Sequence, residues 1–376
     1  MKKNKVILPP KTIGIIGGGQ LGRMMAISAR YMGYKIAVLD PTLNCPTAQV
    51  ADVQLTAAYD DMDAIRELAE ISDVITYEFE NVDLEAAAYL EAQGKLPQGA
   101  FALEITQNRE KEKTMIKELG LPVPNFSIVR NGEDAKVALQ DTTLPAVIKT
   151  CRGGYDGKGQ IKLETEADME EAIRFAEEHK HCIIEEWITF DKEISVVFSR
   201  AVTGEIAFFP ISENEHRDHI LYKTTVPANV NEAVQKKAYH AAELLGEKMN
   251  IVGTFAIEMF VHGDEIYLNE MAPRPHNSGH YSIEACNASQ FDQHILAISG
   301  LPLRKIELLQ PSVMVNVLGE NVEGLLEYMQ SETAGHVHLY GKADIKAKRK
   351  MGHITFISEN PADVQREVDQ YEAKQV

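Results

Sequence analysis

The first hundred residues alternate between short apolar runs and longer segments whose apolar residues recur three or four positions apart. This pattern predicts strands at residues 12–17, 35–40 and 74–79, with helices at 21–32 and 62–71 between them. A β-α-β-α-β order implies a parallel sheet with right-handed crossovers. We therefore expect a Rossmann-like, doubly wound domain over residues 1–105.

The regular alternation ends near Thr106, where the charge-rich segment that starts at Gln107 predicts a helix to Leu119. The next segment, about 120–187, alternates strands and helices and ends in a strand at 182–188, so it predicts a small α+β module. Beyond it the sequence predicts further strands at 193–199 and 205–210, a helix at 234–249 and a hairpin of strands at 254–261 and 265–271. We expect a second domain over 106–298 and a small β-rich C-terminal domain over 299–376.

Composition narrows the class of protein. The chain has 376 residues, 44% of them hydrophobic and 25% charged, which is typical of a folded globular protein. Its net charge of -18 argues against a nucleic-acid surface, and an anionic substrate would need a local cationic cluster. The four cysteines are widely spaced and no segment resembles a signal peptide or a membrane span. We expect a reduced, cytoplasmic protein that binds neither nucleic acid nor membrane.

A glycine-rich loop lies between two predicted strands of the small module. Residues 149–160 read K-T-C-R-G-G-Y-D-G-K-G-Q, with four glycines and a lysine near each end, Lys149 and Lys158. Glycine lets backbone N–H groups approach phosphate oxygens closely. The loop is not a Walker A motif, because no Gly-Lys-Ser/Thr ends it. Taken alone, it fits a flexible basic hairpin as well as a lid that closes over phosphate.

The first strand-to-helix turn contains a second glycine motif, Gly17-x-Gly19-x-x-Gly22, and Asp40 ends the second predicted strand. This arrangement is typical of nicotinamide-binding dehydrogenases, in which the acidic residue holds ribose hydroxyls. The glycines would equally serve a tight turn, or place the helix start at Leu21 against a phosphate of another ligand.

Two pairs of carboxylates are candidates for chemistry. Glu78 and Glu80 lie at the carboxyl end of the third strand, where open α/β sheets bind ligands; we expect one to face solvent and favour Glu80 as the functional one. In the predicted hairpin, pairing centred near Gly263 places Glu258 opposite Leu268 and Glu270 one diagonal step away on the same face. Two carboxylates that share a face suit Mg²⁺, completed by phosphates and waters.

Cationic and polar residues follow this hairpin directly. Residues 271–280 read M-A-P-R-P-H-N-S-G-H, which offers groups suited to a phosphate or polyol. A second basic run includes Lys342, Arg349 and Lys350. In an acidic chain these two clusters are the best candidates for capturing an anion, although the run 346–350 alone would also fit a solvated surface.

The order of these parts resembles the ATP-grasp superfamily, and within it most closely the family of N5-carboxyaminoimidazole ribonucleotide synthetases. The resemblance spans nearly the whole chain and is carried by six stretches: G-I-I-G-G-G-Q-L-G at 14–22, Y-E-F-E-N at 77–81, R-G-G-Y-D-G-K-G-Q at 152–160, E-E-W at 185–187, N-E-M-A-P-R-P-H-N-S-G-H at 269–280 and K-R-K-M-G-H at 348–353. It implies an ATP-grasp fold over 106–298, with 120–187 as a mobile lid. It also implies a homodimer and a reaction in which ATP and bicarbonate form carboxyphosphate and the amine of 5-aminoimidazole ribonucleotide takes up the carboxyl group.

The resemblance also implies roles for individual residues. Glu258 and Glu270 would hold Mg²⁺, or Mn²⁺ in its place, and Tyr155, Lys158, Arg274 and Lys350 would be the catalytic residues. ATP would be bound by Arg109, Lys149, Gly154, Asp156, Gly157, Gln160, Glu185, Glu186, Trp187, Ile188, Glu193 and His216. The ribonucleotide would be bound by Gly19, Gln20, Leu21, Glu78, Glu80, Asn81, Arg274, His276, Asn277, Ser278, Lys342 and Arg349.

One position departs from the superfamily pattern. Many members carry a metal-binding Asn two residues after the last Glu, where this chain has Ala272, and Asn269 precedes the Glu instead. A third metal ligand is therefore left open. The remaining alternatives are a formate-dependent glycinamide ribonucleotide transformylase, a biotin carboxylase, a nicotinamide-binding oxidoreductase and a nucleotide-binding protein without activity.

Overall fold

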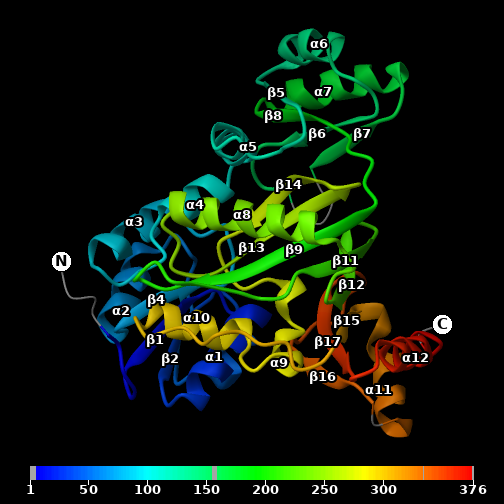
Figure 1. Cartoon of the computed structure of the whole chain (residues 1–376). Helices are drawn as coiled ribbons and strands as arrows, with labels where there is room; N and C mark the ends of the chain where they lie inside the picture. Colours follow the sequence, from blue (N-terminus) through cyan, green and yellow to red (C-terminus); the bar gives the residue numbers. More distant parts are fainter. Residues whose placement is uncertain (1–5, 155–158, 333, 375–376) are drawn as a thin grey trace.

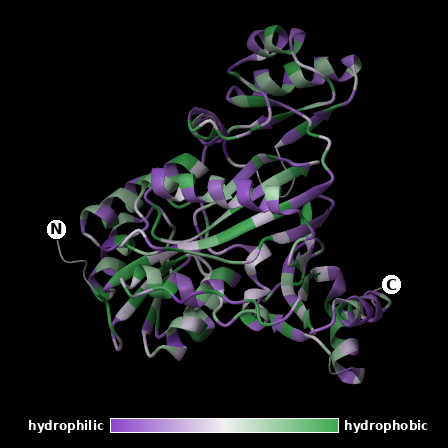
Figure 2. Ribbon diagram, viewed as in Figure 1, coloured by the Kyte–Doolittle hydropathy of each residue, from purple (hydrophilic) through white to green (hydrophobic). Residues whose placement is uncertain are grey.

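Three sheets organise the chain in a computed structural model that describes residues 6–154, 159–332 and 334–374. Figure 1 shows the small antiparallel sheet at the top, a large sheet in the middle that continues to the lower right, and the N-terminal sheet at the lower left. Figure 2 shows mainly hydrophobic residues along the strands and more hydrophilic residues along the helices that cover them. Within the described ranges, no helix combines the length and apolar character needed to cross a bilayer.

The N-terminal sheet is parallel, with strand order β3-β2-β1-β4, which confirms the predicted Rossmann-like domain. Its apolar strands are buried between helices on both faces. Its elements are β1 (Thr12–Ile16), α1 (Gln20–Tyr31), β2 (Lys35–Leu39), β3 (Val53–Leu55), α2 (Met62–Ile71), β4 (Val74–Tyr77) and α3 (Leu84–Ala92).

The small sheet has the order β5-β8-β6-β7, and all its pairs are antiparallel. The glycine-rich loop joins β6 to β7, which confirms its position between two strands. One apolar core lies between this sheet and its two helices. The elements are β5 (Phe126–Val129), α6 (Gly132–Gln140), β6 (Ala146–Thr150), β7 (Gln160–Leu163), α7 (Met169–His179) and β8 (Cys182–Glu186).

The large sheet has nine strands in the order β14-β13-β9-β11-β12-β15-β17-β16, with β10 paired to β9. β12 pairs with β15, so the C-terminal strands continue the central sheet and do not form a sheet of their own. Its strands are β9 (Lys192–Arg200), β10 (Ile206–Phe208), β11 (Ser212–Arg217), β12 (Ile220–Val226), β13 (Gly253–His262), β14 (Glu265–Ala272), β15 (Ser312–Leu318), β16 (His336–Leu339) and β17 (Lys350–Ile357).

Helices cover this sheet and connect it to the other two. The connecting helices α4 and α5 run between the N-terminal and small sheets, and α8 packs on β9, β13 and β14. Helix α10 packs on both β13 and α1, which joins the central and N-terminal sheets. The helices are α4 (Phe101–Thr106), α5 (Arg109–Glu118), α8 (Glu232–Lys248), α9 (Ser282–Ala285), α10 (Gln290–Ile298), α11 (Val322–Ser331) and α12 (Pro361–Glu372).

The turn before α1 is closed by protein side chains. The Glu78 carboxylate accepts hydrogen bonds from the N–H groups of Gly19 and Gly22, the latter at 2.8 Å. Asp40 is buried and accepts from the Gly18 N–H at 2.7 Å and the Tyr59 hydroxyl at 2.6 Å. A carboxylate therefore already occupies the helix N-terminus that a dinucleotide phosphate would need. The prediction that one of Glu78 and Glu80 faces solvent is wrong, because Glu78 caps this turn and Glu80 pairs with Arg274.

The packing at this turn predicts a stability effect. Gly17 has φ +99°, and a Cβ there would lie 2.4 Å from Glu78 Cγ. We expect Gly17→Ala to lower the free energy of unfolding by roughly 2–5 kcal/mol, from backbone strain and overpacking together. Gly94→Ala is the matched control, because Gly94 also has a positive φ (+66°) but no heavy atom within 4 Å of its Cβ position. Urea denaturation of both variants tests this, and equal losses would contradict the packing argument.

Candidate active site

A cavity of about 1420 Å³ lies where the three sheets meet. Its wall includes residues from the N-terminal turn, β6 and β8 of the small sheet, the β13–β14 hairpin and the start of β17. It brings together most of the predicted site residues: Gln20, Leu21, Glu78, Glu80, Arg109, Lys149, Gln160, Glu185, Glu186, Trp187, Ile188, Glu193, His216, Glu258, Glu270, Arg274, His276, Asn277, Lys342, Arg349 and Lys350.

A few predicted residues do not line this cavity. Gly19 is covered by Glu78, Ser278 is buried behind His276, and Asn81 is exposed. Gly154 accepts a hydrogen bond from Arg109 through its carbonyl oxygen. The remaining predictions fall on Tyr155, Asp156, Gly157 and Lys158, which lie outside the described residues.

The carboxylate pair sits on the hairpin, in a register different from the predicted one. Glu258 lies directly opposite Glu270, because a β-bulge between Glu258 and Met259 shifts the pairing. Met259, and not Glu258, is opposite Leu268 because the hairpin turn has two residues, and without the bulge Asn269 would face Glu258. The bulge brings Glu270 into the position opposite Glu258, and the Cβ atoms of such a facing pair are typically ~5 Å apart. The conclusion that the two carboxylates share one face is confirmed.

The surroundings of Glu258 favour a cation. Burial raises the pKa of Glu258 to about 7, and the charges of Glu270 and Glu193 act in the same direction, while His216 and Lys350 oppose them. A facing pair of carboxylates on a cavity wall fits Mg²⁺, whose other ligands would be phosphate oxygens and waters. In the described ranges no cluster of three or more His, Cys, Asp or Glu residues completes a metal site. Asn269 lines the same cavity.

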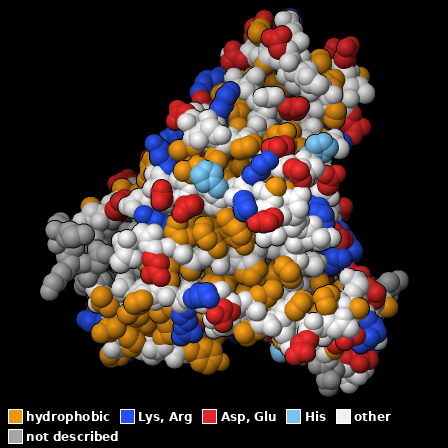
Figure 3. All heavy atoms as spheres, viewed as in Figure 1, with side chains coloured by type: hydrophobic (Ala, Val, Ile, Leu, Met, Phe, Trp, Pro, Cys, Tyr) orange, Lys and Arg blue, Asp and Glu red, His pale blue; other side chains and the backbone are white. Residues whose placement is uncertain are grey.

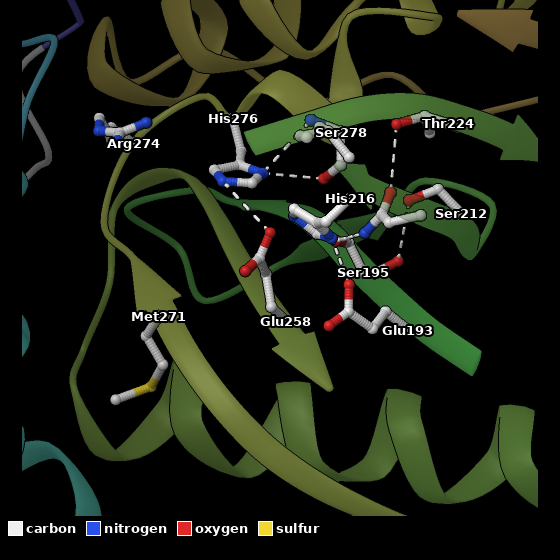
Figure 4. Close-up of polar contacts among 12 residues, drawn as sticks. Glu193, Ser195, Ser212, His216, Thr224, Glu258, Met271, Arg274, His276 and Ser278 are labelled. Atoms are coloured by element: carbon white, nitrogen blue, oxygen red, sulfur yellow. Dashed lines mark hydrogen bonds and ion pairs between the residues drawn. The ribbon is translucent and has the colours of Figure 1, made fainter. Parts of the chain in front are cut away.

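Two histidines, His276 and His216, lie near Glu258, as Figure 4 shows. His276 Nε2 lies 3.7 Å from Glu258 Oε1, and its Nδ1 accepts a hydrogen bond from the Ser278 N–H. Burial, together with the charges of Arg274, Lys350 and His216, holds the pKa of His276 well below its usual value. Because Nδ1 accepts the hydrogen bond from Ser278, the proton of the neutral ring would lie on Nε2, which faces Glu258.

His216 has the opposite character. Burial alone would lower its pKa, but a hydrogen bond to Glu193 and the charge of Glu258 raise it. Behind these residues, Asn214 donates to Ser195 at 2.6 Å and accepts from Thr224 at 3.1 Å. This buried network fixes the strands that carry Glu193 and His216.

The predicted cations approach the cavity from the other side. Arg274 donates through Nε to Glu80 at 2.6 Å, and both side chains are largely buried. Lys350 begins β17 and lines the same cavity as Glu258 on β13. On the face shown in Figure 3, charges of both signs are interspersed without a broad basic patch.

Sequence reasoning missed two charged residues in the cavity wall, Glu112 and Lys113 on α5. Glu112 accepts a hydrogen bond from the Met271 N–H at 2.7 Å, and burial beside Glu270 raises its pKa to about 8. Both lie on the buried face of α5, although the charged residues at the start of this helix suggested a solvated surface. Met115 and Ile116 follow three or four positions later, on the same face of the helix, and this spacing could have indicated that Glu112 and Lys113 are buried.

Comparison with known proteins agrees with this geometry. Three domain-family models match consecutive parts of the chain: a ribonucleotide synthetase preATP-grasp domain at residues 10–107, an ATP-grasp domain at 114–291 and a phosphoribosylaminoimidazole carboxylase C-terminal domain at 312–367. The fold and the site are those of an ATP-grasp ligase.

Similar proteins narrow the class further. The N5-carboxyaminoimidazole ribonucleotide synthase of Bacillus subtilis (strain 168) is 52% identical over 356 residues, which cover 94% of this chain and 93% of the relative. A crystal structure of an N5-carboxyaminoimidazole ribonucleotide synthetase in complex with ADP has a TM-score of 0.95 at 51% identity and covers 98% of both chains. The enzyme of Aspergillus clavatus, in complex with ADP and 5-aminoimidazole ribonucleotide, has a TM-score of 0.90 at 29% identity and covers 97% of this chain and 98% of its own. The chain belongs to the N5-carboxyaminoimidazole ribonucleotide synthase family.

Proposed function

We propose that the chain uses ATP and bicarbonate to carboxylate the amine of 5-aminoimidazole ribonucleotide, giving N5-carboxyaminoimidazole ribonucleotide in de novo purine biosynthesis. The observation that carries this proposal is the position of Glu258 and Glu270. They share one cavity with Lys149 and Glu185 of the small sheet and with Arg274 and Lys350 on the other side. Such a site can hold a phosphoryl donor and an anionic acceptor at the same time.

The chemistry needs two transfers. A bicarbonate oxygen attacks the γ-phosphorus of ATP and displaces ADP, which forms carboxyphosphate. The amine nitrogen then takes up the carboxyl group, while phosphate and one proton leave. Carboxyphosphate is short-lived in water, so the glycine-rich loop would act as a lid that excludes solvent. Phosphoryl transfer needs positioning and fixed positive charge, not a covalent nucleophile.

The residues divide between the two substrates. On the ATP side, Lys149 and Arg109 would bind phosphates, 185–188 the adenine, and Glu193 with His216 the ribose. Glu258 and Glu270 would hold Mg²⁺ or Mn²⁺, which neutralises charge on the transferring phosphoryl group. Tyr155 and Lys158 would face the bicarbonate and carboxyphosphate. Arg274, Lys350 and the cluster 276–278 would bind the ribonucleotide, with Lys342, Arg349, Gln20 and Leu21.

Substrate-dependent ADP release tests the proposal. We expect 5-aminoimidazole ribonucleotide with bicarbonate to stimulate ADP release strongly, because only the complete set of substrates fills the cavity. Glycinamide ribonucleotide with formate, and biotin with bicarbonate, are the controls for related ligases. Stimulation by either control pair but not by the first pair would contradict the proposal. ATP binding without turnover would indicate a protein without activity.

The nicotinamide alternative has lost its support, because Glu78 and Asp40 occupy the N–H groups that a dinucleotide would use. The homodimer and the cytoplasmic location stay predictions.

A further inference from the structure

Three charged side chains meet at the nucleotide end of the cavity. Glu185 on β8 lies between two ammonium groups, with Lys149 Nζ 2.6 Å from its Oε2 and Lys113 Nζ 3.3 Å from its Oε1. The side chains of Lys113 and Glu185 are only 2% and 3% exposed, whereas Lys149 is 17% exposed. All three residues line the cavity, and Lys149 is the more exposed of the two cations.

Two lysine side chains face one carboxylate in this group. Burial alone would raise the pKa of Glu185, but Lys113 and Lys149 lower it to about 2, so the carboxylate is ionised. A buried carboxylate that loses its counter-ion is strongly destabilised. Either lysine can therefore serve as the counter-ion of Glu185 when the other moves away.

Lys149 has two competing partners in the proposed function. It contacts Glu185 in this structure, and it would have to turn toward the phosphates when ATP binds. Lys113 is held more firmly, because it is buried and its ammonium also donates to the Leu268 carbonyl oxygen on β14 at 3.2 Å. It can therefore stay beside Glu185 when Lys149 turns away.

We propose that Lys113 is a positioning residue for nucleotide binding: it neutralises Glu185, and this allows Lys149 to leave Glu185 for the ATP phosphates. The inference rests on the role proposed above for Lys149. Without Lys113, Lys149 would be the only cation beside Glu185 in the described part of the chain, and it would be held there at the expense of the nucleotide.

A double-mutant cycle on the full-length protein tests this inference. The Kd of the non-hydrolysable ATP analogue AMP-PNP, with Mg²⁺, is measured by calorimetry for Lys113→Met, Glu185→Gln and the double variant. We expect Lys113→Met to weaken AMP-PNP binding roughly tenfold, but to change it less than about twofold when Glu185→Gln is present, because no carboxylate then holds Lys149. The Kd of 5-aminoimidazole ribonucleotide should stay within about twofold throughout, which a general structural defect would not allow.

Two further variants complete the test. Lys113→Arg keeps the positive charge, so its Kd for AMP-PNP should lie within about threefold of that of the unaltered protein. If Lys113→Met does not fold, this variant decides the question. A tenfold weaker binding by Lys113→Arg would overturn the inference. An equal loss from Lys113→Met with and without Glu185→Gln, or no loss at all, would also overturn it. Lys149→Met distinguishes a failure of the proposed role of Lys149 from a failure of the inference about Lys113. If it leaves AMP-PNP binding unchanged, the proposed role of Lys149 fails and the inference with it; if it weakens binding while Lys113→Met does not, only the inference fails.

Discussion

Replacing Glu270 with Gln is expected to lower kcat by roughly 10³-fold, because the variant loses half of the carboxylate pair that would hold Mg²⁺. Several kcal/mol of charge stabilisation in phosphoryl transfer depend on such an ion, and each 1.36 kcal/mol is about a tenfold change in rate. Steady-state ADP release with all substrates, followed over a range of Mg²⁺ concentrations, measures the effect. Partial recovery at high Mg²⁺ is expected, since Glu258 remains in place.

Glu265→Gln is the matched control for this variant. Glu265 lies on the same strand, but its side chain is 59% exposed and pairs with Lys237, away from the cavity. We expect near-normal turnover, because exposed ion pairs contribute little. If Glu270→Gln retained near-normal activity at ordinary Mg²⁺, the assignment of the hairpin as the metal site would be wrong.

Replacing Arg274 with Ala is expected to raise the KM for 5-aminoimidazole ribonucleotide by roughly 30-fold or more, with a much smaller effect on the KM for ATP. Arg274 is a largely buried cation in the proposed ribonucleotide site, and its removal also leaves the partly buried Glu80 without its ion-pair partner. Truncating one partner of a buried charge pair typically costs ~2–5 kcal/mol. Steady-state kinetics with each substrate varied in turn separates the two KM values.

A double variant isolates the contribution of substrate binding. The variant that combines Glu80→Gln with Arg274→Ala still lacks the guanidinium, but it no longer contains an unpaired carboxylate. We expect its KM for the ribonucleotide to stay raised, while part of the loss in protein stability is recovered. A defect confined to ATP in Arg274→Ala would show that the two substrate sites are misassigned.

Much of the fold could be predicted from periodicity, but two central strands could not. The N-terminal domain and the hairpin carry clear apolar runs, and their bounds match within a few residues. β11 reads S-E-N-E-H-R, without one apolar residue, because its inward positions are Ser212 and Asn214 in a polar network. Because β11 and β12 could not be predicted, the sequence pattern did not indicate that the C-terminal strands belong to the central sheet.

The candidate site was predicted in outline, since its residues lie in short, distinctive segments. Its electrostatics could not be predicted, because they depend on contacts between distant segments. Glu112 and Lys113 look like part of a solvated charge run, and only the packing of α5 on β14 shows that they are buried. The facing register of Glu258 and Glu270 depends on a bulge for which the sequence carries no glycine signal.

The continuity of the large sheet has a consequence for turnover. Backbone hydrogen bonds connect β13, which carries Glu258, with β17, which begins at Lys350, through β9, β11, β12 and β15. The proposed metal ligand Glu258 and the proposed ribonucleotide-binding Lys350 thus lie on one hydrogen-bonded sheet. Lys149 and Glu185 belong to a separate sheet. With the proposed roles, a movement of the small sheet relative to the large one would release the nucleotide without separating Glu258 from Lys350.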